Sequence, residues 1–252
     1  MKFFKGVQHF FFVGQVLSLG FSLCFLGSSA LARQPGPAKM DPFNCAGSTK
    51  CNASALQLLE QKGFKSLGYD EARMQIYHKI DVYTENGTNY IDCVYSKDRI
   101  EEPVKGLPDS NYFNTEHTVP QSYLKTHPES ALSRADLHHL FPAGSKINGI
   151  RGSYPFGECE AKDETQGILC PGGHSFMPPV KQRGATARAV FYMSIMYGLP
   201  VDNSEEVVLR KWNEKYPPNA YELKRDSLIQ QAQGNANPFV SHPEWVSLIS
   251  DY

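Results

Sequence analysis

The sequence has no excess of basic residues. Of its 252 residues, 25 are Lys or Arg and 26 are Asp or Glu. The first 32 residues have the layout of an export signal, and their removal takes away Lys2 and Lys5 and no acid. The remaining chain then has 23 basic and 26 acidic residues, a net formal charge of −3. Binding of nucleic acid through a global positive field is therefore disfavoured, and any such binding has to be local or mediated by a metal ion.

Two common zinc-binding patterns are also missing. The six cysteines include no Cys-x-x-Cys spacing, and no His-Glu-x-x-His sequence occurs. A structural zinc site is therefore less favoured than disulfides. A zinc hydrolase would have to use Glu116, His117, His138 and His139, and adjacent histidines rarely bind one ion without backbone distortion. It remains the less favoured alternative.

A long apolar run occurs at residues 10–26, after a positive start and before Ala30-Leu31-Ala32. This is the layout of a secretory signal peptide, which predicts cleavage after about residue 32 and a secreted or periplasmic protein. The alternative is a membrane anchor, because the run is near the lower limit of about 17 residues for a spanning helix. Gln15 interrupts the run, which favours cleavage and no stable membrane association afterwards.

No repeat, low-complexity run or long linker divides residues 33–252, so one α+β domain is predicted. Apolar spacing predicts helices at 53–63, 69–77, 183–197, about 203–216, 221–233 and 243–250, with residues 235–239 extended. We expect Asp70 to cap the second helix and Asn203 or Ser204 to cap the fourth. The basic start of the third helix, Lys181, Arg183 and Arg188, is more often a solvated face than a phosphate contact. Asn86-Gly87 between β-favouring runs predicts a hairpin.

In an exported protein, cysteines are expected to pair where geometry allows. We expect Cys45–Cys51 and Cys159–Cys170, each closing a short loop, with Cys93 free and buried in a strand. The sequence alone does not determine this connectivity.

Residues 113–157 concentrate the polar chemistry of the chain. Hydrolysis of a phosphodiester needs a base, a cation near the phosphate and stabilisation of the leaving oxygen. A hard cation such as Mg²⁺ prefers oxygen ligands and keeps several waters, so Glu116 and Asn148 would suffice to hold it. His117 titrates near neutrality and suits the base, while Arg151 lies about one helical turn after Asn148 and could bind the phosphate.

Each of these signals is weak alone. A Glu-His pair is commonplace on surfaces, Asn148 before Gly149 could simply end a helix, and Arg151 could be an ion-pair partner. Asp136, His138 and His139 suit a structural hydrogen-bond network. In a regular strand, Glu116 and His117 would also point to opposite faces, so a shared site requires the strand to end or bend there.

Taken together, several phrases resemble the endonuclease I family of exported bacterial nucleases, within the ββα-metal (His-Me finger) superfamily. The phrases are NTEHTVPQS (114–122), DLHHLFP (136–142), KINGIRGSYPFG (146–157), RGATARA (183–189) with Tyr192-Met193, Trp212-Asn213, Tyr216-Pro217 and QGNANPFV (233–240). The resemblance covers about residues 72–240.

This resemblance implies a single nuclease domain, built around a ββα-metal motif at about 113–152, with a β-hairpin or small sheet and several C-terminal helices. The first strand would carry Glu116 and His117, the second would run near 140–142, and the helix would carry Asn148. By family analogy His117 is the general base, and Glu116 and Asn148 hold one Mg²⁺, with Mn²⁺ or Ca²⁺ as possible substitutes. Cleavage should leave 5′-phosphate and 3′-hydroxyl ends.

One departure concerns residues 118–135. Periplasmic members of the family carry a longer, cysteine-bearing loop there, with an arginine that contacts phosphate. The short connection here looks more like the secreted branch, and its cations are Lys125 and Arg134. Together with Lys146 they are candidate substrate-binding residues, and the choice between DNA and RNA stays open.

The sequence therefore predicts a secreted or periplasmic, sequence-nonspecific endonuclease that acts as a monomer on DNA, RNA or both. A non-catalytic nucleic-acid-binding homologue is the main alternative, although the acidic net charge argues against it.

Overall fold

The computed structural model describes residues 49–252, with side chains from residue 53 onward. The predicted signal segment and Cys45 lie outside the described residues, as does the side chain of Cys51. The predicted Cys45–Cys51 bridge and the signal peptide therefore stay predictions. Residues 49–252 fall within one compact unit.

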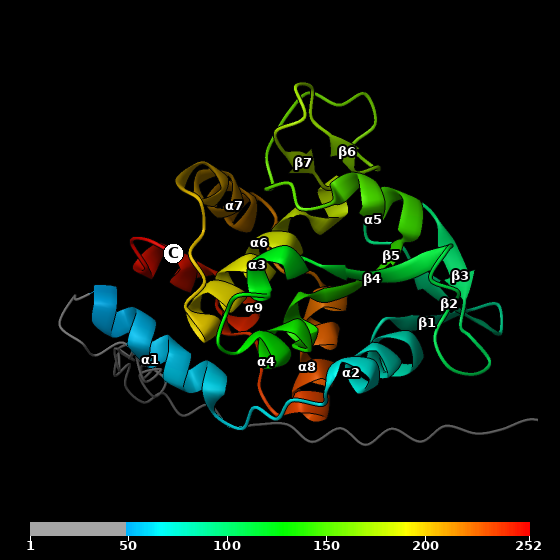
Figure 1. Cartoon of the computed structure of the whole chain (residues 1–252), viewed down its shortest axis with the longest axis horizontal. Helices are drawn as coiled ribbons and strands as arrows, with labels where there is room; N and C mark the ends of the chain where they lie inside the picture. Colours follow the sequence, from blue (N-terminus) through cyan, green and yellow to red (C-terminus); the bar gives the residue numbers. More distant parts are fainter. Residues whose placement is uncertain (1–48) are drawn as a thin grey trace, which may run out of the picture. The chain divides into compact units, whose positions relative to one another are not determined.

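Helices predominate, and the strands are short (Figure 1). In chain order the elements are α1 (Thr49–Gln61), α2 (Tyr69–Gln75), a π-helical turn η1 (Ile76–Ile80), β1 (Val82–Glu85), β2 (Thr88–Asp92), β3 (Arg99–Glu101), β4 (Phe113–His117), α3 (Gln121–Leu124), α4 (Ser130–Arg134), a 3₁₀ turn η2 (Leu137–His139), β5 (Leu140–Gly144), α5 (Ser145–Arg151), β6 (Ile168–Leu169), β7 (Phe176–Met177), α6 (Val180–Tyr197), α7 (Asn203–Lys215), α8 (Ala220–Gln233), α9 (Pro238–Ser241) and a 3₁₀ turn η3 (Pro243–Leu248). This mixture of helices and small sheets confirms the α+β class.

The strands form three small antiparallel sheets, β1-β2-β3, β4-β5 and β6-β7. The predicted hairpin is β1-β2, where Asn86 (φ 51°) and Gly87 (φ 82°) make the turn. Both residues tolerate positive φ, which a two-residue hairpin turn requires. Cys93 is free and buried as expected, but it lies one residue beyond β2.

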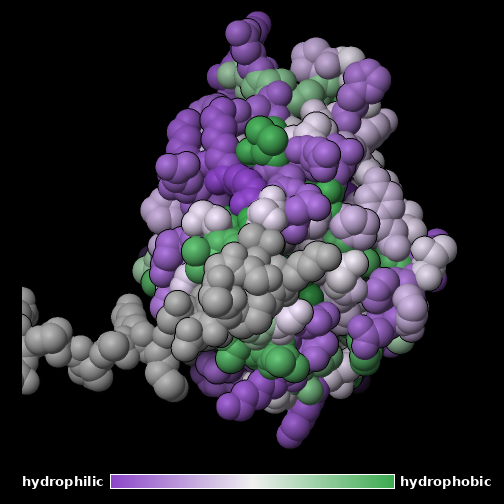
Figure 2. All heavy atoms as spheres, turned by 90° about the vertical axis from the view of Figure 1, so that its left-hand side faces the viewer, coloured by the Kyte–Doolittle hydropathy of each residue, from purple (hydrophilic) through white to green (hydrophobic). Residues whose placement is uncertain are grey.

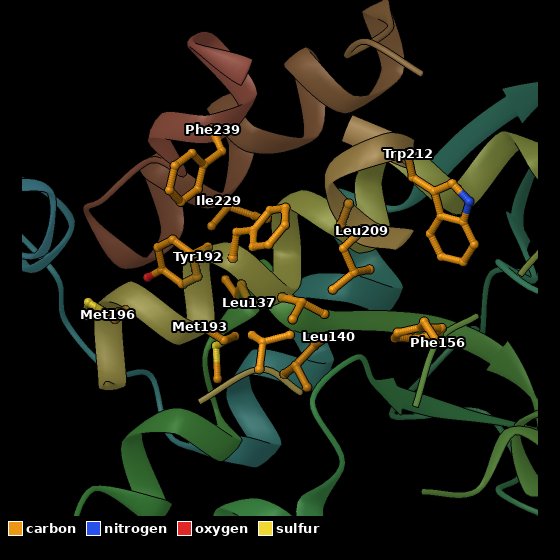
Figure 3. Close-up of a cluster of buried hydrophobic side chains, with 14 of the residues drawn as sticks. Leu137, Leu140, Phe156, Tyr192, Met193, Met196, Leu209, Trp212, Ile229 and Phe239 are labelled. Carbon is orange, nitrogen blue, oxygen red and sulfur yellow. The ribbon is translucent and has the colours of Figure 1, made fainter. Parts of the chain in front are cut away.

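The core is organised around α6, which packs against α1, α7, α9 and η2. Figure 3 shows its Tyr192 and Met193 among apolar side chains from other helices and from β5. Because other elements surround α6, the expectation of a solvated basic face is wrong for Arg183 and Arg188, whereas Lys181 is exposed. Arg183 and Arg188 are buried, and the Arg188 guanidinium makes two 2.6 Å hydrogen bonds to the carboxylate of Glu222.

Helix ends differ in detail from the sequence prediction. The side chain of Asp202, rather than Asn203 or Ser204, accepts the capping hydrogen bond of α7. Asp70 lies in the first turn of α2 after Gly68 and does not cap it. The expected extended tail is partly helical, because α9 begins at Pro238.

Residues between α5 and α6 make the Gly- and Pro-rich excursion that carries the β6-β7 hairpin. The predicted Cys159–Cys170 disulfide is present and closes it, with the two Cα atoms 5.8 Å apart. No helix among residues 49–252 is long and apolar enough to cross a membrane. On the face seen in Figure 2, polar residues predominate and apolar ones occur in separate small groups.

Candidate active site

The strands β4 and β5 and the helix α5 hold the predicted catalytic residues. β4 pairs antiparallel with β5, with Glu116 opposite Phe141 and His117 opposite Leu140. α5 begins directly after β5 and packs against both strands, as Figure 1 shows. Alternate side chains of a strand share a face, so Asn114 and Glu116 lie on the same side of β4. Asn114 contacts Asn148 and Glu116 contacts Arg151, so this side of β4 faces α5.

The Glu116 carboxylate is buried between two polar partners. Its Oε1 accepts a 2.9 Å hydrogen bond from the Tyr95 hydroxyl and lies 3.1 Å from Nε of Arg151 in an ion pair. Burial raises the pKa of Glu116, and the Arg151 charge and the Tyr95 hydrogen bond oppose this rise. The pKa therefore lies above the ordinary glutamate value despite an adjacent cation.

Asn148 is held by an amide on the facing strand. Its Nδ2 donates a 2.8 Å hydrogen bond to Oδ1 of Asn114. Within residues 49–252, no donor is hydrogen-bonded to the carbonyl oxygen of the Asn148 side chain. The arrangement directs the donor group of Asn148 toward β4 and leaves its oxygen available as a ligand.

His117 ends β4 and is almost completely buried. Its Nε2 lies 3.3 Å from the carbonyl oxygen of Arg134. Because a carbonyl only accepts hydrogen bonds, this contact favours the tautomer with the proton on Nε2 and the lone pair on Nδ1. Burial lowers the pKa of His117 to about 3, so the expectation that it titrates near neutrality is wrong. The ring is neutral at pH 7 and therefore able to accept a proton.

Glu116 and His117 face opposite sides of the strand, as the alternation of side chains requires. The His117 ring contacts the rings of Tyr69 and His139, with centroids 5.4 and 5.3 Å away, whereas Glu116 contacts Arg151 and Tyr95. The strand ends at His117, and the backbone N–H of Thr118 donates a 2.9 Å hydrogen bond to the carbonyl of His139. The two adjacent side chains thus flank the end of one strand.

The guanidinium of Arg151 is used within the protein. Arg151 is 1% exposed, and its Nη1 and Nη2 donate to the carbonyls of Gly152 (2.7 Å) and Thr118 (2.6 Å). The third nitrogen, Nε, forms the ion pair with Glu116. In this structure Arg151 positions Glu116 and the end of β4, which differs from the phosphate-binding role expected from the sequence.

Arg134 is the loop cation that lies nearest to His117. Its guanidinium stacks over the Tyr69 ring at 3.9 Å, its Nε donates to Gln121, and its carbonyl contacts His117. Lys125 and Lys146 are exposed, after α3 and on α5 respectively. Arg134 therefore combines exposure with proximity to the candidate base.

Asp136 is the centre of a buried network. Its carboxylate accepts hydrogen bonds from the hydroxyls of Tyr192 and Tyr197, the amide of Gln233 and the backbone N–H of His138. The three side-chain donors connect the segment before β5 to α6 and α8, so the network supports the strand that pairs with His117.

His138 and His139 point to different surroundings. Nε2 of His138 lies 3.1 Å from the carbonyl of Asn235, whereas the His139 ring is buried edge-on to His117. Within residues 49–252, no group of three or more His, Cys, Asp or Glu side chains could hold a metal ion. The four residues that a zinc hydrolase would need do not form such a group.

Sequence reasoning missed Asn114, Tyr95 and Tyr69. Asn114 lies two residues before Glu116, so strand alternation could have placed it on the same face. Tyr95 and Tyr69 have no sequence signal, because they reach the site only through tertiary contacts.

Comparison with known proteins agrees with this arrangement. The model of the family described as Endonuclease I matches residues 49–244, and the chain belongs to this family. A periplasmic deoxyribonuclease of Aeromonas hydrophila is 34% identical over 110 residues, 42% of this chain and 46% of the relative. An extracellular ribonuclease of Bacillus subtilis is 30% identical over 162 residues, 54% of each chain. The chain spans about half the length of these curated relatives.

Proposed function

We propose that this protein is an exported, sequence-nonspecific endonuclease that hydrolyses phosphodiester bonds of DNA, RNA or both with one divalent metal ion. The observation that carries the proposal is that two oxygen donors, Glu116 and Asn148, lie where β4 packs against α5, while His117 follows Glu116 at the end of the strand. The names of its relatives, which include deoxyribonucleases and ribonucleases, support the same class of substrate.

The residues present fit a hard cation. Glu116 offers a carboxylate, and Asn148 offers an amide oxygen that has no protein donor in the described part of the chain. Mg²⁺ prefers such ligands and completes its shell with water and phosphate oxygens, and Mn²⁺ or Ca²⁺ could take its place. When bound, the ion would neutralise charge on the scissile phosphate. The Glu116 carboxylate would then bind the ion and lose part of its ion pair with Arg151.

The chain's own groups supply the rest of the chemistry. Nδ1 of His117 takes a proton from the attacking water, because the contact of Nε2 with the carbonyl of Arg134 keeps the lone pair on Nδ1. The low pKa keeps the imidazole neutral, with Nδ1 unprotonated, before that step. Arg134 is better placed than Arg151 to contact phosphate, since it is exposed and lies against Tyr69.

The order β4, β5, α5 supports assignment of residues 113–152 to the ββα-metal motif, with Asn148 on the helix and His117 at the end of the first strand. The products would carry 5′-phosphate and 3′-hydroxyl ends. The relatives are named as periplasmic or extracellular, which supports export of this chain after removal of residues 1–32. We propose a monomer without stable membrane association.

Digestion of plasmid DNA and total RNA tests the proposal. The wild-type protein should cleave DNA, RNA or both when Mg²⁺ is present, and cleavage should stop when a chelator is added. His117→Ala should lose activity, whereas His174→Ala, an exposed histidine of the β6-β7 excursion, should not. Full activity of His117→Ala would remove His117 as the base. Tight, salt-sensitive binding without cleavage in any divalent metal would instead identify a non-catalytic homologue.

A further inference from the structure

A cleft of about 650 Å³ opens beside the candidate active site. Its walls come from α3 and the residues before it, from the residues that follow α5, from α6 and from the residues that join α6 to α7. The polar and aromatic side chains that line the cleft include Thr118, Tyr123, Arg151, Tyr154, Ser194 and Glu205. This volume lies in the range of about 300–1,000 Å³ typical of small-molecule sites.

Direct contacts connect the cleft to the proposed metal ligand. Oε1 of Glu205 accepts a 2.8 Å hydrogen bond from the backbone N–H of Phe156. The Phe156 ring lies 4.6 Å from the guanidinium of Arg151, which in turn forms the ion pair with Glu116. Thr118, whose carbonyl binds Arg151, also lines the cleft and directly follows His117. A group bound in the cleft would therefore lie next to the reacting phosphate.

Flat aromatic rings at the edge of the cleft are exposed. Tyr123 is 56% exposed and Tyr154 is 39% exposed. The Tyr123 hydroxyl donates a 3.3 Å hydrogen bond to the carbonyl of Ser153, which restricts the ring orientation. Exposed aromatic side chains of this kind stack nucleobases, with about 1–3 kcal/mol per base as the typical contribution.

The charges of the cleft disfavour a phosphate and favour a base edge. Asp202 and Glu205 both line it, and the cation that lines it, Arg151, is already paired with Glu116. Within residues 49–252, no donor is hydrogen-bonded to Oε2 of Glu205. A carboxylate oxygen of this kind accepts N–H groups and repels carbonyl oxygens.

We infer that the cleft binds the nucleobase adjacent to the scissile phosphate and that Glu205 makes guanine the preferred base. The inference rests on the proposed function, since it takes the phosphate to lie at Glu116 and Asn148. Guanine presents two neighbouring donors, N1–H and the N2 amino group, whereas uracil and thymine present one N–H between two carbonyl oxygens. Carboxylate acceptors therefore match guanine best and uracil or thymine worst.

A base can enter the cleft only when it is unpaired, because a duplex keeps its Watson–Crick edge occupied. Turning a base out of a duplex costs a few kcal/mol. The preference for guanine should therefore be larger on single-stranded than on double-stranded substrate.

Nucleotide binding tests the inference without catalysis. Titration of the full chain with guanosine 5′-monophosphate and uridine 5′-monophosphate, in chelator, should show about tenfold tighter binding of the guanine nucleotide, the effect of one charge-assisted hydrogen bond. Glu205→Gln retains an oxygen for the Phe156 N–H and should reduce the ratio to about twofold or less. Glu214→Gln, an exposed acid on α7 outside this cleft, should keep it. Equal affinities in the wild-type protein would overturn the inference.

Sequencing of the cleavage ends separates this inference from the proposed function. Single-stranded oligonucleotides that contain one guanine in a thymine or uracil run should be cut most often next to the guanine by the wild-type protein, with weaker cleavage elsewhere, and about evenly along the run by Glu205→Gln. Cleavage without any bias, or an unchanged bias in Glu205→Gln, would refute the role of Glu205. A chain that binds the guanine nucleotide selectively but cleaves nothing would refute the nuclease proposal and leave the cleft assignment standing.

Discussion

The hydrogen bond between Asn114 and Asn148 gives a specific prediction about metal affinity. Asn114→Ala removes the 2.8 Å contact that orients the Asn148 amide and leaves the Asn148 oxygen in place. The hydroxyl of Tyr77 bonds to the backbone carbonyl of Asn114, so the strand keeps that contact in the variant. The substitution therefore tests orientation of the ligand without deleting it.

The size of the effect follows from one hydrogen bond. A typical net contribution is about 0.5–1.5 kcal/mol, and about 1.4 kcal/mol corresponds to a factor of ten. We expect Asn114→Ala to raise the half-saturating Mg²⁺ concentration about two- to tenfold, with the rate at saturating Mg²⁺ nearly unchanged. Asn148→Ala deletes the proposed oxygen ligand itself and should raise the half-saturating Mg²⁺ concentration further.

Metal-activation curves of plasmid cleavage measure this effect. Because Asn114 acts through Asn148, the double variant should match Asn148→Ala alone, the non-additivity expected of groups in contact. Asn111→Ala, in the loop before β4, is the matched control and should behave as the wild type. Additive effects of the two substitutions, or an Asn114→Ala curve identical to that of the wild type, would refute the reasoning.

Two stability predictions concern buried charges. Asp81→Ala leaves Arg225 without the carboxylate that it contacts at 2.8 and 3.2 Å, so unfolding by heat or urea should show a loss of about 3–5 kcal/mol and about 6–20 °C in Tm. Asp92→Ala, an exposed carboxylate on β2, is the control, and a loss under about 1 kcal/mol for Asp81→Ala would contradict the buried pair. Burial raises the pKa of Glu60 well above its ordinary value, and the negative charge of Asp136 raises it further. The native state therefore binds the proton of the Glu60 carboxyl group more tightly than the unfolded chain does. Stability should therefore fall as pH rises above the ordinary glutamate range, and the Tm of Glu60→Gln should exceed that of the wild type more at pH 8 than at pH 5. A constant difference across that range would refute the assignment.

Local signals predicted the elements that a short stretch of chain can specify. Asn86-Gly87 predicted the hairpin because both residues accept positive φ, and Gly198 and Gly234 end α6 and α8 in the left-handed conformation. Cys159 and Cys170 close a loop short enough for their pairing to be predicted. These features depend on neighbours within about a dozen residues.

The residues of the candidate site could be proposed from the sequence, but their interactions could not. The order and spacing of Glu116, His117 and Asn148 along the chain were enough to mark them as candidates. The sequence also suggested that Arg151 would bind phosphate and that His117 would titrate near neutrality. The fold instead buries both side chains, pairs Arg151 with Glu116 and lowers the pKa of His117, because the sequence does not show how completely the fold removes these groups from water.

The sequence by itself determined the class of the protein, its local turns and helices, and the polar residues of the candidate site. Only the tertiary structure decided which charges are buried and with which partners. Arg151 binds the carbonyl of Thr118, 33 residues away, and Arg225 binds Asp81, 144 residues away. Desolvation and ion pairing depend on atoms that are close in space, and for these pairs proximity arises only when distant segments pack together.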